Sequence, residues 1–173
     1  MYNDMGKQND PICILLLSKP FYMGIDKDIH QAKFRNEHQK ASVNLLYTYG
    51  WMVERTKELF ALEDITPQQF NILRILRGSH PQPLSTLQIR ERMLDKMSDS
   101  SRIVDRLITK GLVKKGTCKT DRRLVDVMIT DKGKKILERL DQRQDDLDNI
   151  IGNLSEKEAA ILSELLDKIR GSK

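Results

Sequence analysis

The amino-acid sequence predicts a mainly α-helical protein with one short β-hairpin. Aromatic residues make up only 5% of the chain, and its apolar residues are rich in Leu, Ile and Met, which suits helices better than a β-sandwich. Apolar residues recur at spacings of three and four through most of the chain, as on one face of a helix. Two short apolar segments, residues 112–115 and 124–129, flank a polar loop and are typical of a hairpin.

The first predicted helix covers residues 28–62, which contain no proline and a single glycine, Gly50. Its apolar stripe consists of Leu45, Leu46, Tyr49, Met52, Val53, Thr56, Leu59 and Phe60. The core of a small chain cannot cover a stripe of this length, so we expect the helix to pack against another chain as well. Residues 1–27 are expected to form a poorly ordered extension, the alternative being a short segment that packs on a partner subunit.

Three capped helices are predicted in the middle of the chain. The first begins after Thr66 and ends before the His-Pro-Gln-Pro run at residues 80–83. Ser85 is expected to cap a short second helix, and the third covers residues 98–110 and is closed by Gly111. The third helix has an inward face of Ile103, Val104, Leu107 and Ile108, and an outward face of Arg102, Asp105, Arg106 and Lys110.

Two further helices are predicted after the hairpin. Thr130 is expected to open a long helix that continues through Ile151 and is broken at Gly152. Ser155 and Glu158 have the spacing of a capping box and start the last helix. One side of this last helix carries Ile161, Leu162, Leu165, Leu166 and Ile169.

Positive charge is concentrated in one quarter of the sequence. The chain has a formal charge of +5, yet residues 84–124 alone contain eleven Lys or Arg against five Asp or Glu. Such a patch is typical of a phosphate-binding surface, although charge alone is also compatible with a solvated face. The longest apolar run is only six residues, at 12–17, too short to span a membrane. Two cysteines, Cys13 and Cys118, make no disulfide framework, so a cytoplasmic location is expected.

The order helix, turn, helix, basic hairpin is the most informative feature of this quarter. A helix-turn-helix places the start of its second helix over base edges in the major groove of DNA. Residues at that start, with one a turn further on, are Ser98, Asp99, Ser100, Ser101, Arg102 and Arg106. The hairpin then forms a wing whose tip carries Lys119, Arg122 and Arg123 toward the minor groove. A helix cap with solvated arginines is the alternative for each feature taken alone.

Three motifs in this order resemble the MarR (multiple antibiotic resistance regulator) family of winged-helix transcription factors. They are ITPQQFNILRIL at residues 65–76, SSRIVDRLITKGLVKK at residues 100–115, and TDRRLVDVMITDKGKKILERL at residues 120–140. The third contains the family's Asp-x-Arg wing signature and the following Thr-x-x-Gly helix start. The resemblance extends over about residues 28–173.

The resemblance implies a winged helix-turn-helix homodimer that reads a pseudo-palindromic operator on double-stranded DNA. It implies dimerisation helices at residues 28–62 and 131–173, with a DNA-binding lobe at residues 63–130 between them. By position, Asp121 orients the wing, Arg123 enters the minor groove and Arg122 contacts a phosphate. The function that this predicts is a transcriptional repressor released by a small ligand.

A small lipophilic or phenolic effector is the other partner that the resemblance implies. Tyr47, Tyr49, Trp51 and Met52 lie on the relevant helix, although aromatic and Met residues on a helix stripe are more often core. A redox-responsive regulator is an alternative, because cations near Cys118 in the wing favour a reactive thiolate.

No metal, cofactor or catalytic activity is expected. His30 and His38 are eight residues apart, two helical turns, and cannot comfortably share a metal ion. The sequence contains no phosphate-binding glycine loop and no hydrolase or metalloprotease motif. A helical protein-interaction module that does not bind DNA remains the alternative from a different class, and the wing arginines argue against it.

Overall fold

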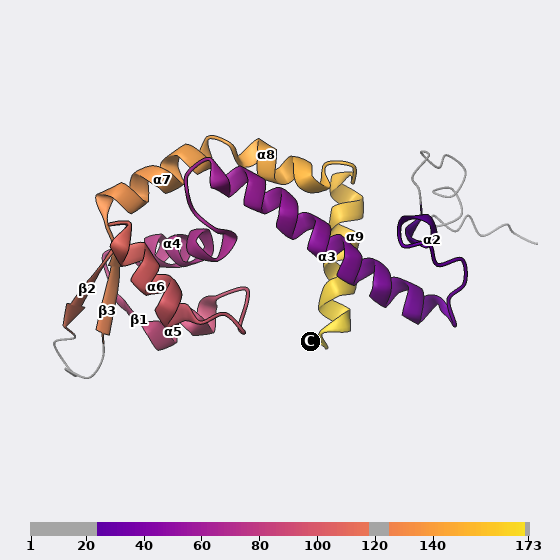
Figure 1. Ribbon diagram of the computed structural model, residues 1–173, viewed down its shortest axis with the longest axis horizontal. Helices are drawn as coiled ribbons and strands as arrows, with labels where there is room; N and C mark the ends of the chain where they lie inside the picture. The colour runs from indigo at the N-terminus through magenta and orange to yellow at the C-terminus, as the bar shows by residue number, and fades with distance from the viewer. Residues whose placement is uncertain (1–23, 118–124, 172–173) are drawn as a thin grey trace, which may run out of the picture. The chain divides into compact units, whose positions relative to one another are not determined.

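The computed structural model describes residues 24–117 and 125–171. The chain divides into two units, residues 1–49 and residues 50–173. The first contains α2 (Ile25–Asp28) and the beginning of α3 (Glu37–Ala61), which ends in the second. The second unit also contains α4 (Pro67–Ser79), β1 (Leu84–Ser85), α5 (Thr86–Arg92), α6 (Ser100–Thr109), β2 (Val113–Thr117), β3 (Val125–Ile129), α7 (Asp131–Asp141), α8 (Gln144–Asp148), the 3-10 helix η1 (Asn149–Ile151) and α9 (Glu156–Ile169) (Figure 1).

Reciprocal capping boxes fix the starts of three helices, α4, α5 and α9. The sequence predicts the cap residue of α4 and α5, a Thr and a Ser, and both residues of the box at α9. The Thr66 hydroxyl accepts a hydrogen bond from the Gln69 N–H, and the Gln69 side chain accepts one from the Thr66 N–H. Ser85 and Gln88 form the same box at α5, and Ser155 and Glu158 form it at α9. Each box satisfies amides that a helix start otherwise leaves without partners.

The beginning of the chain differs from the prediction in two places. Residues 25–28, expected to be a poorly ordered extension and the start of a long helix, form α2 instead. The long helix itself begins at Glu37 rather than at residue 28. Its start is fixed locally, because the Asn36 side chain accepts from the Gln39 N–H and the Gln39 side chain accepts from the Arg35 N–H.

A three-stranded antiparallel sheet with the order β1-β3-β2 replaces the simple hairpin that the sequence predicts. The β2–β3 hairpin is confirmed, with Val113 opposite Ile129 and Gly116 opposite Asp126, so β2 extends into the predicted loop. The additional strand β1 pairs Leu84 with Val127. Two residues are too few to show a periodicity, and only the pairing with β3 defines this strand. The sequence therefore did not predict it.

The predicted helix over residues 131–151 is wrong as a single helix. It ends at Asp141, and α8 begins again at Gln144. The intervening turn is held by the Arg143 N–H, which donates to the Leu140 carbonyl at 3.0 Å, and by the Arg143 guanidinium, which donates to Asp146 at 2.8 Å. No proline or glycine marks this position in the sequence.

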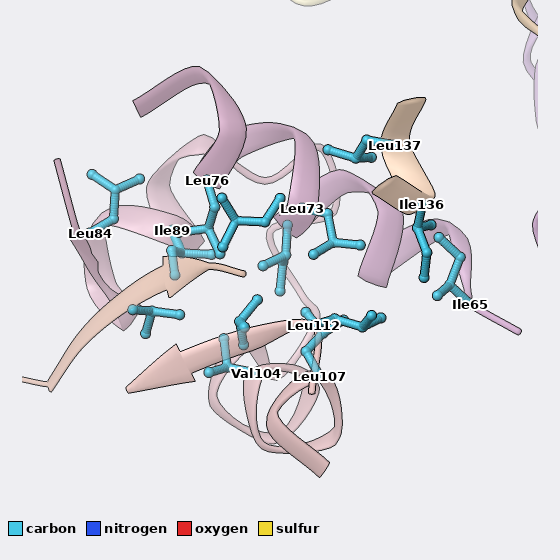
Figure 2. Close-up of a cluster of buried hydrophobic side chains, with 14 of the residues drawn as sticks. Ile65, Leu73, Leu76, Leu84, Ile89, Val104, Leu107, Leu112, Ile136 and Leu137 are labelled. Atoms are coloured by element: carbon cyan, nitrogen blue, oxygen red, sulfur yellow. The ribbon is translucent and has the colours of Figure 1, made fainter. Parts of the chain in front are cut away.

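The hydrophobic core of the second unit is enclosed by α4, α5, α6, α7 and the sheet (Figure 2). Its fully buried side chains are Ile72, Leu73, Leu76, Ile89, Met93, Val104, Leu107, Leu112, Val127 and Leu137. Burial of one large aliphatic side chain contributes about 1.5–3 kcal/mol, so this cluster fixes how α6 and the hairpin lie on α4. No helix among the described residues is long and apolar enough to cross a membrane.

Two glycines permit the close packing between α6, β2 and α7. Gly111 adopts a φ of +70° directly after α6, as the prediction of a glycine stop requires. Gly133 lies in the first turn of α7, where an added Cβ would be 2.4 Å from the Leu112 carbonyl oxygen. The Thr130 hydroxyl accepts from the Gly133 N–H, which confirms Thr130 as the cap of this helix.

Candidate nucleic-acid interface

Helix α6 separates its residues cleanly between the core and solvent. Val104 and Leu107 are fully buried, and Ile103 and Ile108 pack against the same cluster. The opposite side, which we call the outer face of α6, consists of Ser101, Arg102, Asp105, Arg106 and Thr109, all exposed. The predicted assignment of inward and outward residues holds for these positions, since the 3.6-residue period fixes it.

The two arginines of the outer face lie one turn apart and form no ion pair among the described residues. The carboxylates closest to them in sequence are engaged in other contacts. Asp99 caps α6 by accepting from the Arg102 N–H at 3.1 Å, and Asp105 accepts from the Lys115 ammonium at 2.6 Å. The guanidinium groups of Arg102 and Arg106 are therefore available to an external anion.

The predicted serine-rich start of α6 has several distinct roles. The Ser98 hydroxyl donates to Asp95 at 2.5 Å, within the turn that precedes the helix. Ser101 is exposed on the outer face. Ser100 is buried, with only 6% of its surface exposed, so its side chain does not contribute to an open contact surface. The helical period places Ser100 on the inward side, four and seven residues before Val104 and Leu107, so this burial has a signal in the sequence that the prediction of a serine-rich contact surface did not use.

An exposed ion pair joins the wing to α6, in addition to the core that they share. Lys115 of β2 contacts Asp105 of α6, and the β2–β3 ladder runs from the Val113–Ile129 pair to the Thr117–Val125 pair. The predicted wing residues Lys119, Asp121, Arg122 and Arg123 lie outside the described residues, as does Cys118.

The C-terminal end of α6 is anchored to the start of α7 by two contacts that the sequence did not predict. The Lys132 ammonium donates to the Lys110 carbonyl at 2.9 Å, and the Thr130 hydroxyl donates to the Gly111 carbonyl at 2.8 Å. A cation next to the last carbonyls of a helix is electrostatically favourable. These contacts fix the axis of α6 relative to α7.

Ion pairs connect α7 to α4 and to the turn that follows α3. Asp141 of α7 accepts from Arg77 at 2.5 Å and from Arg74 at 3.1 Å, both on α4. The hydrogen bond from Arg77, followed by the positive charges of Arg77 and Arg74, lowers the pKa of Asp141. Arg139 binds Glu63 through both carboxylate oxygens and lowers the pKa of Glu63 in the same way. These partners are more than sixty residues apart in sequence, so no local signal predicts them.

A surface groove of about 570 Å³ lies between the end of α3 and the α8–η1 segment. Trp51, Arg55 and Leu59 line one side, and Arg143 and Ile150 line the other. The Arg55 guanidinium lies 5.8 Å from the centre of the Trp51 ring.

Four residues of α3 are the predicted ligand contacts, and only one of them lines this groove. That residue is Trp51. Met52 is half-buried and does not line the groove, whereas Tyr47 and Tyr49 are exposed and belong to the first unit. The described residues contain no group of three or more His, Cys, Asp or Glu side chains arranged to hold a metal ion.

Comparison with known proteins identifies the family. The sequence profile of the MarR family matches residues 63–124. The chain is 30% identical over 106 residues to the HTH-type transcriptional regulator MhqR of Bacillus subtilis (strain 168), a match that covers 61% of this chain and 72% of MhqR. The chain belongs to the MarR family. This MarR-family chain is a transcriptional regulator, and the resemblance drawn from the three sequence motifs is confirmed.

Solved structures agree with this assignment. A MarR transcription factor from Planctomyces limnophilus is 33% identical, with a TM-score of 0.59 over 78% of this chain and 98% of that one. A mutant MarR from E. coli, complexed with operator DNA, is 26% identical, with a TM-score of 0.70 over 79% of this chain and 98% of that one. The predicted winged helix-turn-helix fold is thereby confirmed.

Proposed function

We propose that this MarR-family regulator binds a pseudo-palindromic DNA operator through the outer face of α6 and the β2–β3 wing. The observation that carries the proposal is the exposed pair Arg102 and Arg106, on a helix whose other side is fixed in the core. Arg102, at the first turn, is assigned to base edges, because guanine offers two acceptors to a guanidinium group. Arg106, one turn later, is assigned to a phosphate.

The E. coli MarR structure supports this assignment, because that protein is complexed with operator DNA and shares the fold. The wing residues Lys119, Asp121, Arg122 and Arg123 are included in the proposed interface by their place in the sequence motif. Ser98 and Asp99 are assigned to shaping the start of α6, since their side chains are engaged in the turn and the cap.

We further propose that the active form is a homodimer built from residues 28–62 and 131–173, with residues 63–130 as the DNA-binding lobe. Helix α9 supports a partner, because it has no buried residue and its apolar side chains Ile161, Leu162, Leu165 and Ile169 are exposed. A contiguous apolar stripe of this kind is typical of an interface that another chain covers. Two recognition helices in one dimer require half-sites about 34–36 Å apart.

The regulator is proposed to be a cytoplasmic repressor, without enzymatic activity, that a small lipophilic or phenolic anion releases. The groove beside Trp51 offers an aromatic wall with the apolar side chains Leu59 and Ile150, which suits the lipophilic part of such a ligand. Its cations Arg55 and Arg143 are each paired with a carboxylate of the same lining, Glu58 and Asp146, so an anionic group would have to compete for them. Ligand binding there would change the separation of the two α6 helices in the dimer and so disrupt the register of phosphate contacts. Reversible oxidation of Cys118 is the alternative release mechanism.

Selection of bound sequences from a random pool of duplex DNA tests the proposed function. The expected result is a consensus with two-fold symmetry, and half-sites spaced by about one helical turn. Arg123→Ala is expected to lower the affinity for that consensus markedly while leaving the thermal unfolding midpoint unchanged. A pool without enrichment at low ionic strength, or an Arg123→Ala variant with full affinity, would contradict the proposal or its wing assignment, respectively.

A further inference from the structure

The turn between α5 and α6, residues 94–97, presents two large apolar side chains almost entirely to solvent. Leu94 is 89% exposed and Met97 is 93% exposed, the two highest values among the exposed large hydrophobic side chains of the described residues. Single exposed apolar residues are ordinary on protein surfaces and need no explanation. Two in one four-residue turn, directly before the helix proposed to enter the major groove, call for a contact partner.

The turn is held in a defined conformation by four hydrogen bonds, one of which joins the Lys96 ammonium to the Glu91 carbonyl. The Leu94 N–H donates to the Asn71 side chain of α4 at 2.9 Å. Asp95 accepts from the Met97 N–H at 2.9 Å and from the Ser98 hydroxyl at 2.5 Å. The two apolar side chains therefore project from a backbone that is already ordered before any partner binds, which reduces the entropy lost on binding.

The surroundings of the turn favour DNA as the partner. Met97 is two residues before Asp99, the N-cap of α6. It therefore lies beside the N-terminal end of α6, the end that a helix-turn-helix directs toward base edges. Lys96, between the two apolar residues, is exposed, as is Arg102 at the first turn of α6. The turn is thus continuous with the outer face of α6. Among the base edges that are exposed in the major groove, the apolar group is the C5-methyl group of thymine.

We propose that Leu94 and Met97 contact thymine methyl groups of the operator and so contribute to its sequence preference. This inference rests on the proposed function, because it requires α6 to lie in the major groove. It adds an apolar contribution to recognition that neither the arginines nor the wing supplies. Unlike their phosphate contacts, this contribution is insensitive to salt, since it releases no counterions.

The test measures binding of the full chain to a duplex that carries the selected consensus. Each thymine is replaced in turn by deoxyuridine, which lacks only the C5-methyl group. The wild type is expected to lose about fourfold in affinity for each contacted methyl, at one or two thymines per half-site. Met97→Ala and Leu94→Ala are each expected to bind the thymine duplex several-fold more weakly and to lose the penalty at the thymine that the residue contacts.

Lys96→Ala is the matched control, because it alters the same turn while leaving Leu94 and Met97 in place. It is expected to weaken binding in a salt-dependent way and to keep the full deoxyuridine penalty. Circular dichroism and thermal unfolding of all three variants are expected to match the wild type, since these side chains are exposed.

Three outcomes overturn the inference. Deoxyuridine penalties that are equal in the wild type and in the apolar variants would show that Leu94 and Met97 do not contact the methyl groups. A change in the oligomeric state of the DNA-free protein on replacing Leu94 or Met97 would assign the turn to contact between copies of the chain. A wild type that binds no duplex would overturn the proposed function itself, and the inference with it.

Discussion

Helices α6 and α9 are both amphipathic, but they are completed in different ways. The apolar side of α6 is buried in the chain's own core, where Val104 and Leu107 have no exposed surface. The apolar side of α9 is open, with Leu165 52% exposed and Ile169 70% exposed. The same amphipathic pattern therefore gives a helix with a buried apolar face in one place and a helix with an exposed apolar face in the other.

This difference in burial indicates different roles for the two helices. A helix whose apolar side is fixed in the core can present a rigid charged face, and α6 presents Arg102 and Arg106 in this way. A helix whose apolar side is open gains stability only when a second chain covers it. Binding of DNA and dimerisation are thus expected to respond to different substitutions, and the predictions below separate them, from the largest effect to the smallest.

The largest effect is expected from Leu107→Ala in the buried side of α6. Removal of a fully buried leucine leaves a cavity and lowers the free energy of unfolding by about 2–5 kcal/mol. Urea denaturation followed by circular dichroism measures this loss. Thr109→Ala, on the outer face of the same helix, is the control and is expected to change the stability little. A stable Leu107→Ala variant would place α6 outside the core.

Leu165→Glu in α9 is expected to act on assembly instead. A carboxylate within the apolar stripe loses its hydration when the partner covers it, so the dimer dissociation constant is expected to rise by about 100-fold. Sedimentation equilibrium measures the constant. Ser163→Glu adds the same charge to the polar side of α9 and is expected to leave it unchanged. Equal constants for both variants would remove α9 from the dimer interface.

The smallest effect is expected from Asp141→Asn, which breaks the contacts of α7 with Arg77 and Arg74. The pKa of Asp141 is lowered in the folded chain, so its stabilising contribution is present above its ordinary value near 3.8 and is lost as the pH falls through the lowered value. Because the Asp141 side chain is 37% exposed, solvent screens the pair, and the contribution is below about 1 kcal/mol.

Thermal or urea unfolding between pH 7 and pH 3 measures this contribution. The difference in unfolding free energy between the wild type and Asp141→Asn is expected to shrink at the acidic end of the series. Asp148→Asn, at an exposed position of α8, serves as the control. A difference that is constant over the whole pH range would mean that the charge of Asp141 does not contribute to stability.

Local signals in the sequence predicted much of the region between residues 63 and 130. Helix starts follow from Thr66, Ser85 and Thr130, because each hydroxyl accepts from an amide only three residues away. The outer face of α6 follows from the helical period, which places Arg102 and Arg106 opposite Val104.

Features that depend on distant partners were not predictable. Strand β1 exists only through its pairing with β3, and Asp141 finds Arg77 from a position 64 residues away. The break between α7 and α8 also lacked a signal, since its turn is stabilised by an ordinary side chain, Arg143, rather than by proline or glycine. Sequence patterns report which face of an element is apolar, but they do not report which segment covers it.

The salt dependence of DNA binding tests the central claim most directly. Binding of the selected duplex is measured from about 50 to about 200 mM salt for the wild type, for the double variant Arg102→Ala/Arg106→Ala, and for the exposed double control Lys135→Ala/Lys157→Ala. Each lost phosphate contact reduces the slope of log affinity against log salt concentration by about 0.9. The account predicts that the arginine variant loses about 100-fold in affinity and has a shallower slope, whereas the lysine control matches the wild type. An arginine variant with wild-type affinity and slope would contradict it.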